Sequence, residues 1–110
     1  MARDLGWGDV RMVEFGGPHK TRPALVLTRG SAIPYLNAIT VAPVTRTIRG
    51  IPTEITLGVE EGLKTPSVAT LDAIQTVRSS RLGRYLGSIP ASRRAEVREA
   101  VLFALGLETA

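Results

Sequence analysis

The 110-residue chain contains no cysteine, which excludes disulfide bonds, thiolate metal sites and cysteine nucleophiles. Long apolar runs are also missing. The apolar runs of this sequence are far shorter than the roughly 18 consecutive residues that a membrane-spanning helix needs. The first residues include no apolar segment of signal-peptide length, so we expect a cytoplasmic protein. Hydrophobic residues make up 44% of the chain and charged residues 22%, which is typical of a folded protein. We therefore expect a single domain spanning residues 1–110.

Lysine is rare, and arginine supplies most of the positive charge. Fourteen basic residues face ten acidic ones, for a net charge of +4, and twelve of the fourteen are arginine. A guanidinium group pairs with phosphate through two parallel hydrogen bonds and stacks on nucleobases. This composition favours a polyanionic partner, most simply nucleic acid, although a genome that prefers arginine codons would give the same excess.

Short apolar segments separated by glycine and proline indicate a protein built mainly of β-strands. Residues 7–15 alternate loosely between apolar and polar, and residues 24–28 form a continuous apolar run that predicts a strand buried on both faces. Between them, residues 16–21 contain two glycines and a proline and predict a mobile loop. Further strands are expected at residues 38–42, 53–57, 67–71, 73–77 and 85–89.

The pattern changes period near the C-terminus. Over residues 91–105, Val97, Val101, Ala104 and Leu105 recur on one helical face. Gly106 follows at the position where a left-handed residue ends a helix. The predicted fold class is therefore mainly β with a C-terminal helix, arranged as a small antiparallel barrel or strongly bent sheet with the helix packed on it.

Familiar catalytic spacings are absent from the sequence. The chain has no phosphate-binding P-loop, no HExxH zinc motif and no G-x-S-x-G nucleophile elbow. His19 is the only histidine and lies in the glycine- and proline-rich loop, which argues against a Ser-His-Asp triad. Glu60 and Glu61 form the only adjacent acidic pair, which we interpret as an exposed loop edge. We expect no metal and no cofactor.

The informative residues stand where strands meet loops. Pro23 restrains Arg22 to an extended backbone just before the buried strand. Thr45 follows the third predicted strand, so the two side chains would project near the same sheet edge if strands two and three are neighbours. A guanidinium beside a hydroxyl is a plausible phosphate site, and further polar side chains would surround it: His19, Lys20, Arg46 and Arg49. The alternative interpretation is a solubilising rim.

These residues stand in motifs that resemble the MazF/PemK family of toxin endoribonucleases from type II toxin–antitoxin modules. Residues 20–26 (KTRPALV) are similar to the family's [KR]-x-R-P-x-[LV]-V motif, and residues 41–45 (VAPVT) to its V-x-P-[IV]-T segment. Other segments that resemble the family follow in the expected order along the chain, at residues 8–10, 52–54, 62–68, 80–83 and 104–107.

The resemblance implies an SH3-like or CcdB-like barrel that forms a homodimer, with RNA along the dimer interface. It also implies a MazE-like antitoxin whose C-terminal tail occupies the same groove. By matching position, Arg22 is the catalytic arginine and Thr45 the catalytic hydroxyl residue, and residues 16–21 form a flexible loop that gates the site. The residues expected to bind RNA are His19, Lys20, Arg46, Thr47, Arg49, Asp72 and Gln75.

The activity implied by the resemblance is metal-independent cleavage of single-stranded RNA to 2′,3′-cyclic phosphate and 5′-OH ends, which inhibits translation and growth. The target class stays open between mRNA, tRNA and rRNA, and so does the choice of general acid and base. Residues 72–76 read DAIQT where many family members read D-Q-I-[RK]-T, so Gln75 stands where a basic residue is usual. We therefore expect a cleaved sequence different from that of better-known members.

Two other functions fit a small basic barrel. A CcdB-like gyrase poison shares the fold, but that function relies on a C-terminal Trp-Gly-Ile, whereas this chain ends in residues 107–110 (LETA). A non-catalytic RNA-binding barrel would use the same basic loops. The R-P and P-V-T segments are the main argument against it.

Overall fold

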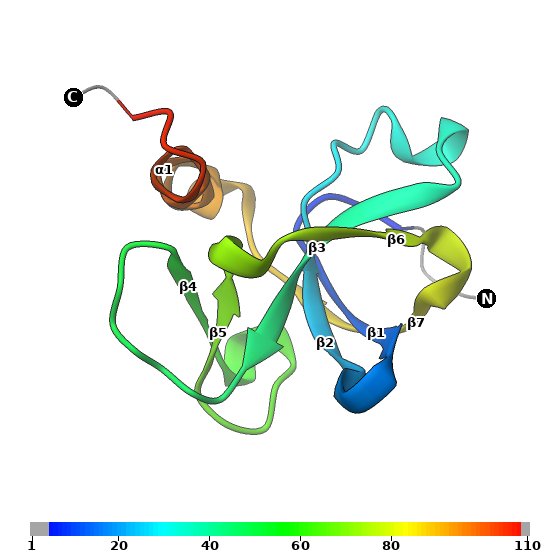
Figure 1. Ribbon diagram of the computed structural model, residues 1–110, viewed down its shortest axis with the longest axis horizontal. Coiled ribbons are helices and arrows are strands. Elements are labelled where there is room, and N and C mark those ends of the chain that lie inside the picture. The colour runs from blue at the N-terminus through cyan, green and yellow to red at the C-terminus, as the bar shows by residue number, and fades with distance from the viewer. Residues whose placement is uncertain (1–4, 109–110) are drawn as a thin grey trace.

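The computed structural model describes residues 5–108, which fold into a bent antiparallel sheet with one α-helix at its side (Figure 1). The helix α1 spans Arg94–Ala104 and follows a short 3₁₀ turn at Ala91–Arg93. The seven strands are β1 (Asp9–Gly16), β2 (Lys20–Val26), β3 (Ala38–Thr45), β4 (Glu54–Leu57), β5 (Ser67–Thr70), β6 (Gln75–Arg78) and β7 (Leu82–Ser88). The predicted class, mainly β with a C-terminal helix, is confirmed.

The strands form one continuous sheet in the order β4-β5-β3-β2-β1-β7, and β6 adds to β3 beside this path. All of these pairs are antiparallel. The two ends of the order, β4 and β7, are not hydrogen-bonded neighbours, so the sheet is a half-barrel rather than a closed barrel. The consecutive strands β1 and β2, β2 and β3, and β4 and β5 are neighbours in the sheet, whereas β4, β6 and β7 each follow a strand with which they do not pair.

Strand β3 is longer than the sequence pattern predicts, because Pro43 does not end it. One edge of β3 pairs with β2, whereas the other edge pairs with β6 over residues 38–41 and with β5 over residues 44–45. Pro43 falls between these two outer partners, where its missing N–H interrupts neither ladder. The strand therefore continues to Thr45 and joins the two halves of the molecule seen in Figure 1.

The core lies on both faces of the central strands. Ala24 and Val26 belong to one apolar cluster and Leu25 to the other, so the predicted burial of this strand on both faces is confirmed. Helix α1 covers the second cluster with Val97 and Ala100. Leu105, expected on the same face, is exposed instead, because the helix has already ended at Ala104.

The helix ends as its sequence predicts. Gly106 has a φ of +69°, in the left-handed region that glycine adopts without strain. The Leu107 N–H donates to the Leu102 carbonyl at 2.8 Å, and the Gly106 N–H donates to Phe103 at 3.2 Å. These two bonds make a Schellman cap. No helix among residues 5–108 has the length and hydropathy that crossing a membrane requires.

The loop between β4 and β5 packs directly on β7. Gly62 has a φ of +87°, and a side chain at this position would overlap the Leu86 carbonyl. Next to it, Glu61 is buried: its Oε1 accepts the Gly58 N–H at 2.6 Å, and its Oε2 lies 3.7 Å from Nη1 of Arg93. The expectation of an exposed loop edge is therefore wrong for Glu61, whose carboxylate is held by Gly58 of the loop and lies near Arg93, whereas Glu60 is exposed as expected.

Candidate functional site

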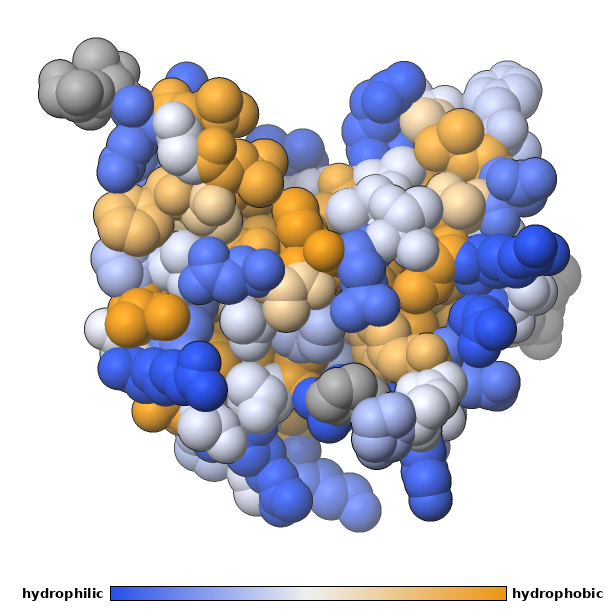
Figure 2. Space-filling model, in the orientation of Figure 1, coloured by the Kyte–Doolittle hydropathy of each residue, from blue (hydrophilic) through white to orange (hydrophobic). Residues whose placement is uncertain are grey.

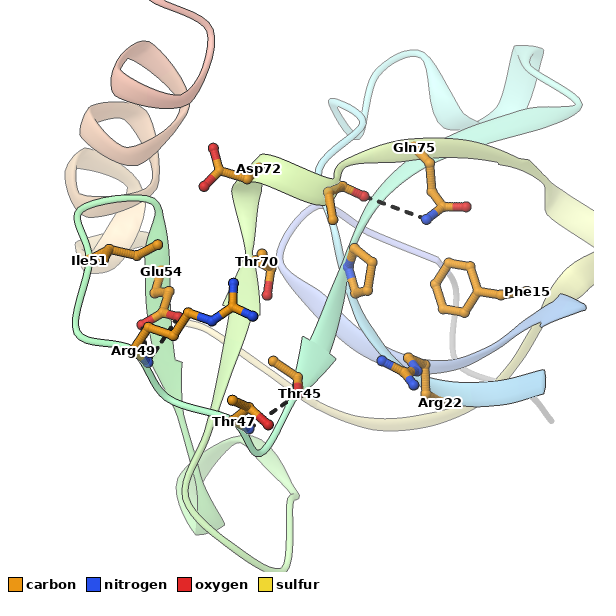
Figure 3. A pocket seen from close by; sticks show the side chains of 12 residues that line it. Phe15, Arg22, Thr45, Thr47, Arg49, Ile51, Glu54, Thr70, Asp72 and Gln75 are labelled. Atoms are coloured by element: carbon orange, nitrogen blue, oxygen red, sulfur yellow. Dashed lines mark hydrogen bonds between the residues drawn. The ribbon is translucent and has the colours of Figure 1, made fainter. Parts of the chain in front are cut away.

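A cleft of about 380 Å³ opens where β3 crosses between the two halves of the sheet (Figure 3). We call it the first cleft. Its two sides come from different strands, with Phe15 of β1 and Gln75 of β6 on one side and Arg49 of the β3–β4 loop and Glu54 of β4 on the other. The residues that line it are Phe15, Arg22, Pro43, Thr45, Thr47, Arg49, Ile51, Glu54, Thr70, Asp72, Ala73 and Gln75.

A second cleft of about 590 Å³ adjoins the first and continues toward the β4–β5 loop. Arg22, Thr45 and Thr47 line both clefts and form the wall that they share. Figure 2 shows hydrophilic side chains projecting along the lower edge of this face, and hydrophobic ones gathered over α1. The other residues of the second cleft are Thr21, Pro23, Val44, Arg46, Leu63, Lys64, Thr65 and Ser67.

Arg22 projects into the shared wall from β2, where its backbone pairs with Val13 of β1. Its Nε is buried and has no hydrogen-bond partner among the described residues. Leaving a buried donor unpaired costs about 1–3 kcal/mol, and more when the group is charged. An anionic ligand would remove that cost by supplying an oxygen. The geometry of Arg22 is thus that of a cation prepared for a bound anion.

Thr45 is the last residue of β3, and its side chain is oriented by the turn that follows. The Thr47 N–H donates to Thr45 Oγ1 at 3.1 Å, so the hydroxyl oxygen acts as an acceptor. The hydroxyl hydrogen is then available for a further acceptor in the cleft. Thr45 and Arg22 line the same wall, as expected for neighbouring strands β2 and β3.

The loop between β3 and β4 is held over the first cleft by Glu54. The carboxylate of Glu54 accepts the Gly50 N–H at 2.8 Å and the Arg49 N–H at 3.2 Å to each oxygen. Charge-assisted bonds of this kind are stronger than neutral ones. They fix the loop so that the Arg49 guanidinium points back across the cleft toward Thr45 and Thr70 (Figure 3).

The far end of the first cleft is polar and partly acidic. The Thr53 hydroxyl donates to Asp72 Oδ2 at 2.7 Å, which anchors the 3₁₀ turn at Leu71–Ala73. Gln75 opens β6, and its Nε2 donates to the Ala73 carbonyl at 3.5 Å, the outer limit for a hydrogen bond. The amide of Gln75 therefore keeps most of its hydrogen-bonding capacity.

The structure gathers most of the predicted site residues. Arg46 lines the second cleft, Thr47 lines both, and the first cleft includes Arg49, Asp72 and Gln75. Lys20 opens β2 with a φ of +48° and lines neither cleft. The side chain of His19 lies outside the described part of the structure. The predicted loop at residues 16–21 is a 3₁₀ turn at Gly17–His19 followed directly by β2.

Among the cleft residues that sequence reasoning missed, Phe15, Glu54 and Lys64 bear most on ligand binding. Phe15 appeared only as the end of an alternating strand, and Glu54 only as part of a family segment. Lys64 stands in the 62–68 segment that resembles the family and is one of only two lysines, which was a usable signal. Within residues 5–108, no group of three histidine or acidic side chains is arranged to hold a metal ion.

A small antiparallel half-barrel with a buried, unpartnered arginine Nε and an oriented hydroxyl between two clefts is suited to holding an anionic group. The family match is more specific. Residues 7–105 match the family described as the PemK-like, MazF-like toxin of type II toxin–antitoxin systems. The chain belongs to this family.

Individual proteins similar to this chain come from the same family. Endoribonuclease MazF3 of Mycobacterium tuberculosis is 38% identical over 99 residues, which cover 90% of this chain and 96% of the relative. The structure of Mycobacterium tuberculosis toxin MazF-mt6 superposes with a TM-score of 0.85 at 37% identity, covering 92% of this chain and 99% of that one. The structure of a mycobacterial endoribonuclease in complex with its cognate antitoxin superposes with a TM-score of 0.83 at 26% identity. The match covers 97% of this chain and 100% of that one.

The chain is thus an endoribonuclease of the MazF type, and the resemblance read from its motifs is confirmed. The family match sets aside both alternatives considered from the sequence, the gyrase poison and the non-catalytic barrel.

Proposed function

We propose that this toxin cleaves single-stranded RNA without a metal ion, through attack of the substrate's own 2′-OH on the adjacent phosphorus. The 2′-oxygen gives up its proton as it bonds to phosphorus, the P–O5′ bond breaks, and the leaving 5′-oxygen takes up a proton, giving a 2′,3′-cyclic phosphate and a 5′-OH. The observation that carries the proposal is the buried, unpartnered Nε of Arg22 in the wall shared by the two clefts. A phosphodiester group placed there would give that N–H an acceptor.

Arg22 acts in this proposal as a fixed cation. Negative charge grows on the nonbridging oxygens as the phosphorane forms, and a guanidinium binds two such oxygens with parallel hydrogen bonds. Because the Nε of this guanidinium is buried, its interaction with the added charge is stronger than it would be in solvent. The group therefore stabilises the transition state more than the bound substrate.

Thr45 supplies a second hydrogen bond to the phosphorane. Its oxygen accepts the Thr47 N–H, which leaves the hydroxyl hydrogen to donate to a nonbridging oxygen. The backbone bond fixes the side chain before substrate arrives, so little ordering remains for the reaction step.

The partners we propose are those implied by the family. The substrate is RNA of the mRNA, tRNA or rRNA class. The toxin cleaves it in the cytoplasm, and this cleavage inhibits translation. The protein acts as a homodimer, and a MazE-like antitoxin covers the RNA groove with its C-terminal tail. Solved relatives support the antitoxin: MazE–MazF from Deinococcus radiodurans superposes with a TM-score of 0.75 at 28% identity, over 96% of this chain and 99% of that one.

The test is incubation of long single-stranded RNA with the purified protein in EDTA, followed by sequencing of the new ends. We expect discrete cuts with 5′-OH ends, and Arg22→Ala should cut at least about 100-fold more slowly, the effect of losing one electrostatic stabiliser. Arg84→Ala, which removes an exposed arginine of β7, is the matched control. Cutting at the wild-type rate by a folded Arg22→Ala protein would contradict the role of Arg22.

A further inference from the structure

The two clefts present different chemistry to an RNA strand. Three cations, Arg22, Arg46 and Lys64, line the second cleft together with hydroxyl groups, and none of its described lining residues is acidic. The first cleft adds an aromatic ring, a side-chain amide and two carboxylates to its arginines. A phosphodiester backbone is uniformly anionic, whereas a nucleobase is flat, neutral and distinguished by donors and acceptors on its edge.

Charge disfavours a phosphate at the far end of the first cleft. Asp72 lines that end, whereas Glu54 lies on the side of the cleft with Arg49, and an ionised carboxylate can only accept hydrogen bonds. A phosphate would meet like charge there, at a cost that grows in a partly enclosed site. The exocyclic amino group or ring N–H of a base would instead find acceptors.

Phe15 offers a flat surface for such a base. Its side chain is half-buried because one part packs against the apolar cluster around Val13, which restrains the ring. The rest lines the first cleft beside Gln75 (Figure 3). Bases of single-stranded RNA commonly stack on aromatic side chains held in this way.

Gln75 can read the edge of a base stacked there. Its amide carries both an acceptor and two donors, and the one bond that it makes, to the Ala73 carbonyl, is long at 3.5 Å. Glutamine forms paired hydrogen bonds with a base edge that presents a donor beside an acceptor. Because the side chain is exposed at the start of β6, it can turn toward the cleft without disturbing the core.

We propose that the first cleft takes one nucleobase next to the scissile phosphate, stacked on Phe15 and read by Gln75, while the RNA backbone continues along the second cleft on Arg46 and Lys64. This inference rests on the proposed function, because it places the scissile phosphate at the shared wall. It makes Phe15 and Gln75 specificity-determining residues and makes Lys64 a sequence-independent contact.

The test compares cut sites in a pool of random RNA for the wild type and three variants. Gln75→Glu keeps the shape but removes the donors, and Phe15→Leu keeps an apolar side chain but removes the ring. Both should change the base frequency by at least about fivefold at one position beside the cut, with the other positions unchanged. Lys64→Gln should weaken binding at all sites equally and lower the salt dependence by about one phosphate contact.

Matched variants away from the clefts control for general effects. Phe103→Leu changes the exposed phenylalanine of α1, and Arg84→Gln removes one charge from β7; both should cut with the wild-type base profile. If Gln75→Glu and Phe15→Leu lower cutting at every site in proportion and leave the base profile intact, the first cleft reads no base. The inference is then wrong even though cleavage is confirmed.

A binding experiment separates this inference from the cleavage chemistry. RNA that is 2′-O-methylated throughout cannot react wherever the cut would lie, and a single abasic position can be moved along it. Wild-type affinity should fall at least about fivefold with the abasic position at one place only, and Phe15→Leu should lose that dependence. This result supports the base pocket even if the wild type cuts nothing. Equal affinity for every abasic RNA overturns the pocket.

Discussion

The two clefts share a wall, but their outer walls are held in different ways. The β3–β4 loop over the first cleft is held by one side chain, Glu54, which binds the N–H groups of Arg49 and Gly50. The β4–β5 loop beside the second cleft is held by backbone packing of Gly62 against β7. A loop held by a side chain can change with one substitution and little effect on the core. A loop held by backbone packing allows almost no change, which suits a contact common to all RNA sequences.

The largest effect should come from breaking the backbone packing. Gly62→Ala places a Cβ against the Leu86 carbonyl and forces a non-glycine residue to a φ of +87°. The two costs together should lower the free energy of unfolding by about 3 kcal/mol or more. Urea denaturation measures this loss in the free energy of unfolding. Gly30→Ala is the control, because a Cβ at that position meets no atom within 4 Å. Equal midpoints for the two variants would show that the β4–β5 loop is not held at Gly62.

Removing the hydroxyl of Thr45 tests the shared wall. Thr45→Val keeps the shape and should lower the cleavage rate about tenfold or more, or about 1.4 kcal/mol, because the bond is strongest in the transition state. Affinity for uncleavable RNA should change less than about threefold, since one neutral hydrogen bond contributes modestly to binding. Thr45→Ser should restore cutting. Equal losses of cutting and of affinity would make Thr45 a binding residue only.

Loss of the Glu54 side chain should loosen the first cleft and leave the second intact. Glu54→Ala removes the acceptor of the Arg49 and Gly50 N–H groups, so their amide hydrogens should exchange about tenfold faster, because bonds to a charged group contribute about 1.5–3 kcal/mol. The Gly62 amide, bonded to the Val59 carbonyl, serves as the internal reference. Glu60→Ala is the control variant. Unchanged exchange at residues 49 and 50 would mean that another contact holds the loop.

The smallest expected effect concerns acid stability where the start of α1 meets β4 and the β4–β5 loop. Arg93 joins α1 to this region, since its Nη2 donates to the Thr56 carbonyl at 2.8 Å and to Glu96 at 2.8 Å. The hydrogen bond from Arg93 lowers the pKa of Glu96 and, with it, raises the pKa of Arg93. A lowered carboxyl pKa stabilises the fold above the ordinary pKa of glutamate, about 4.3, and that contribution is lost as the pH falls further.

Because the Arg93–Glu96 pair is partly exposed, its contribution should not exceed about 0.5 kcal/mol. Glu96→Gln should therefore be slightly less stable than the wild type in urea at pH 6, and the two proteins should converge at pH 3. A difference that stays constant across this range would show that the Arg93–Glu96 ion pair does not contribute to stability.

Much of the site could be predicted from local sequence. The apolar run after Pro23 indicated a buried strand with Arg22 at its start, and Gly106 marked the end of the helix, because backbone preferences and the periodicity of side chains are local properties. The length of β3 was misjudged at Pro43, since a proline ends a strand only when its missing N–H faces a partner. That depends on where β5 and β6 separate, which is a property of the whole sheet.

The sequence alone determined the mainly β composition, the C-terminal helix, the arginine-rich charge and the residues that open and close the central strands. These follow from side-chain size, charge and backbone preference within a few neighbouring positions. Only the tertiary structure decided that Arg22 and Thr45 share a wall, that Glu61 is buried beside Arg93, and that Phe15 lies beside Gln75 in one cleft. These residues lie far apart in the chain. Whether their side chains meet therefore depends on strand register and on how the half-barrel bends.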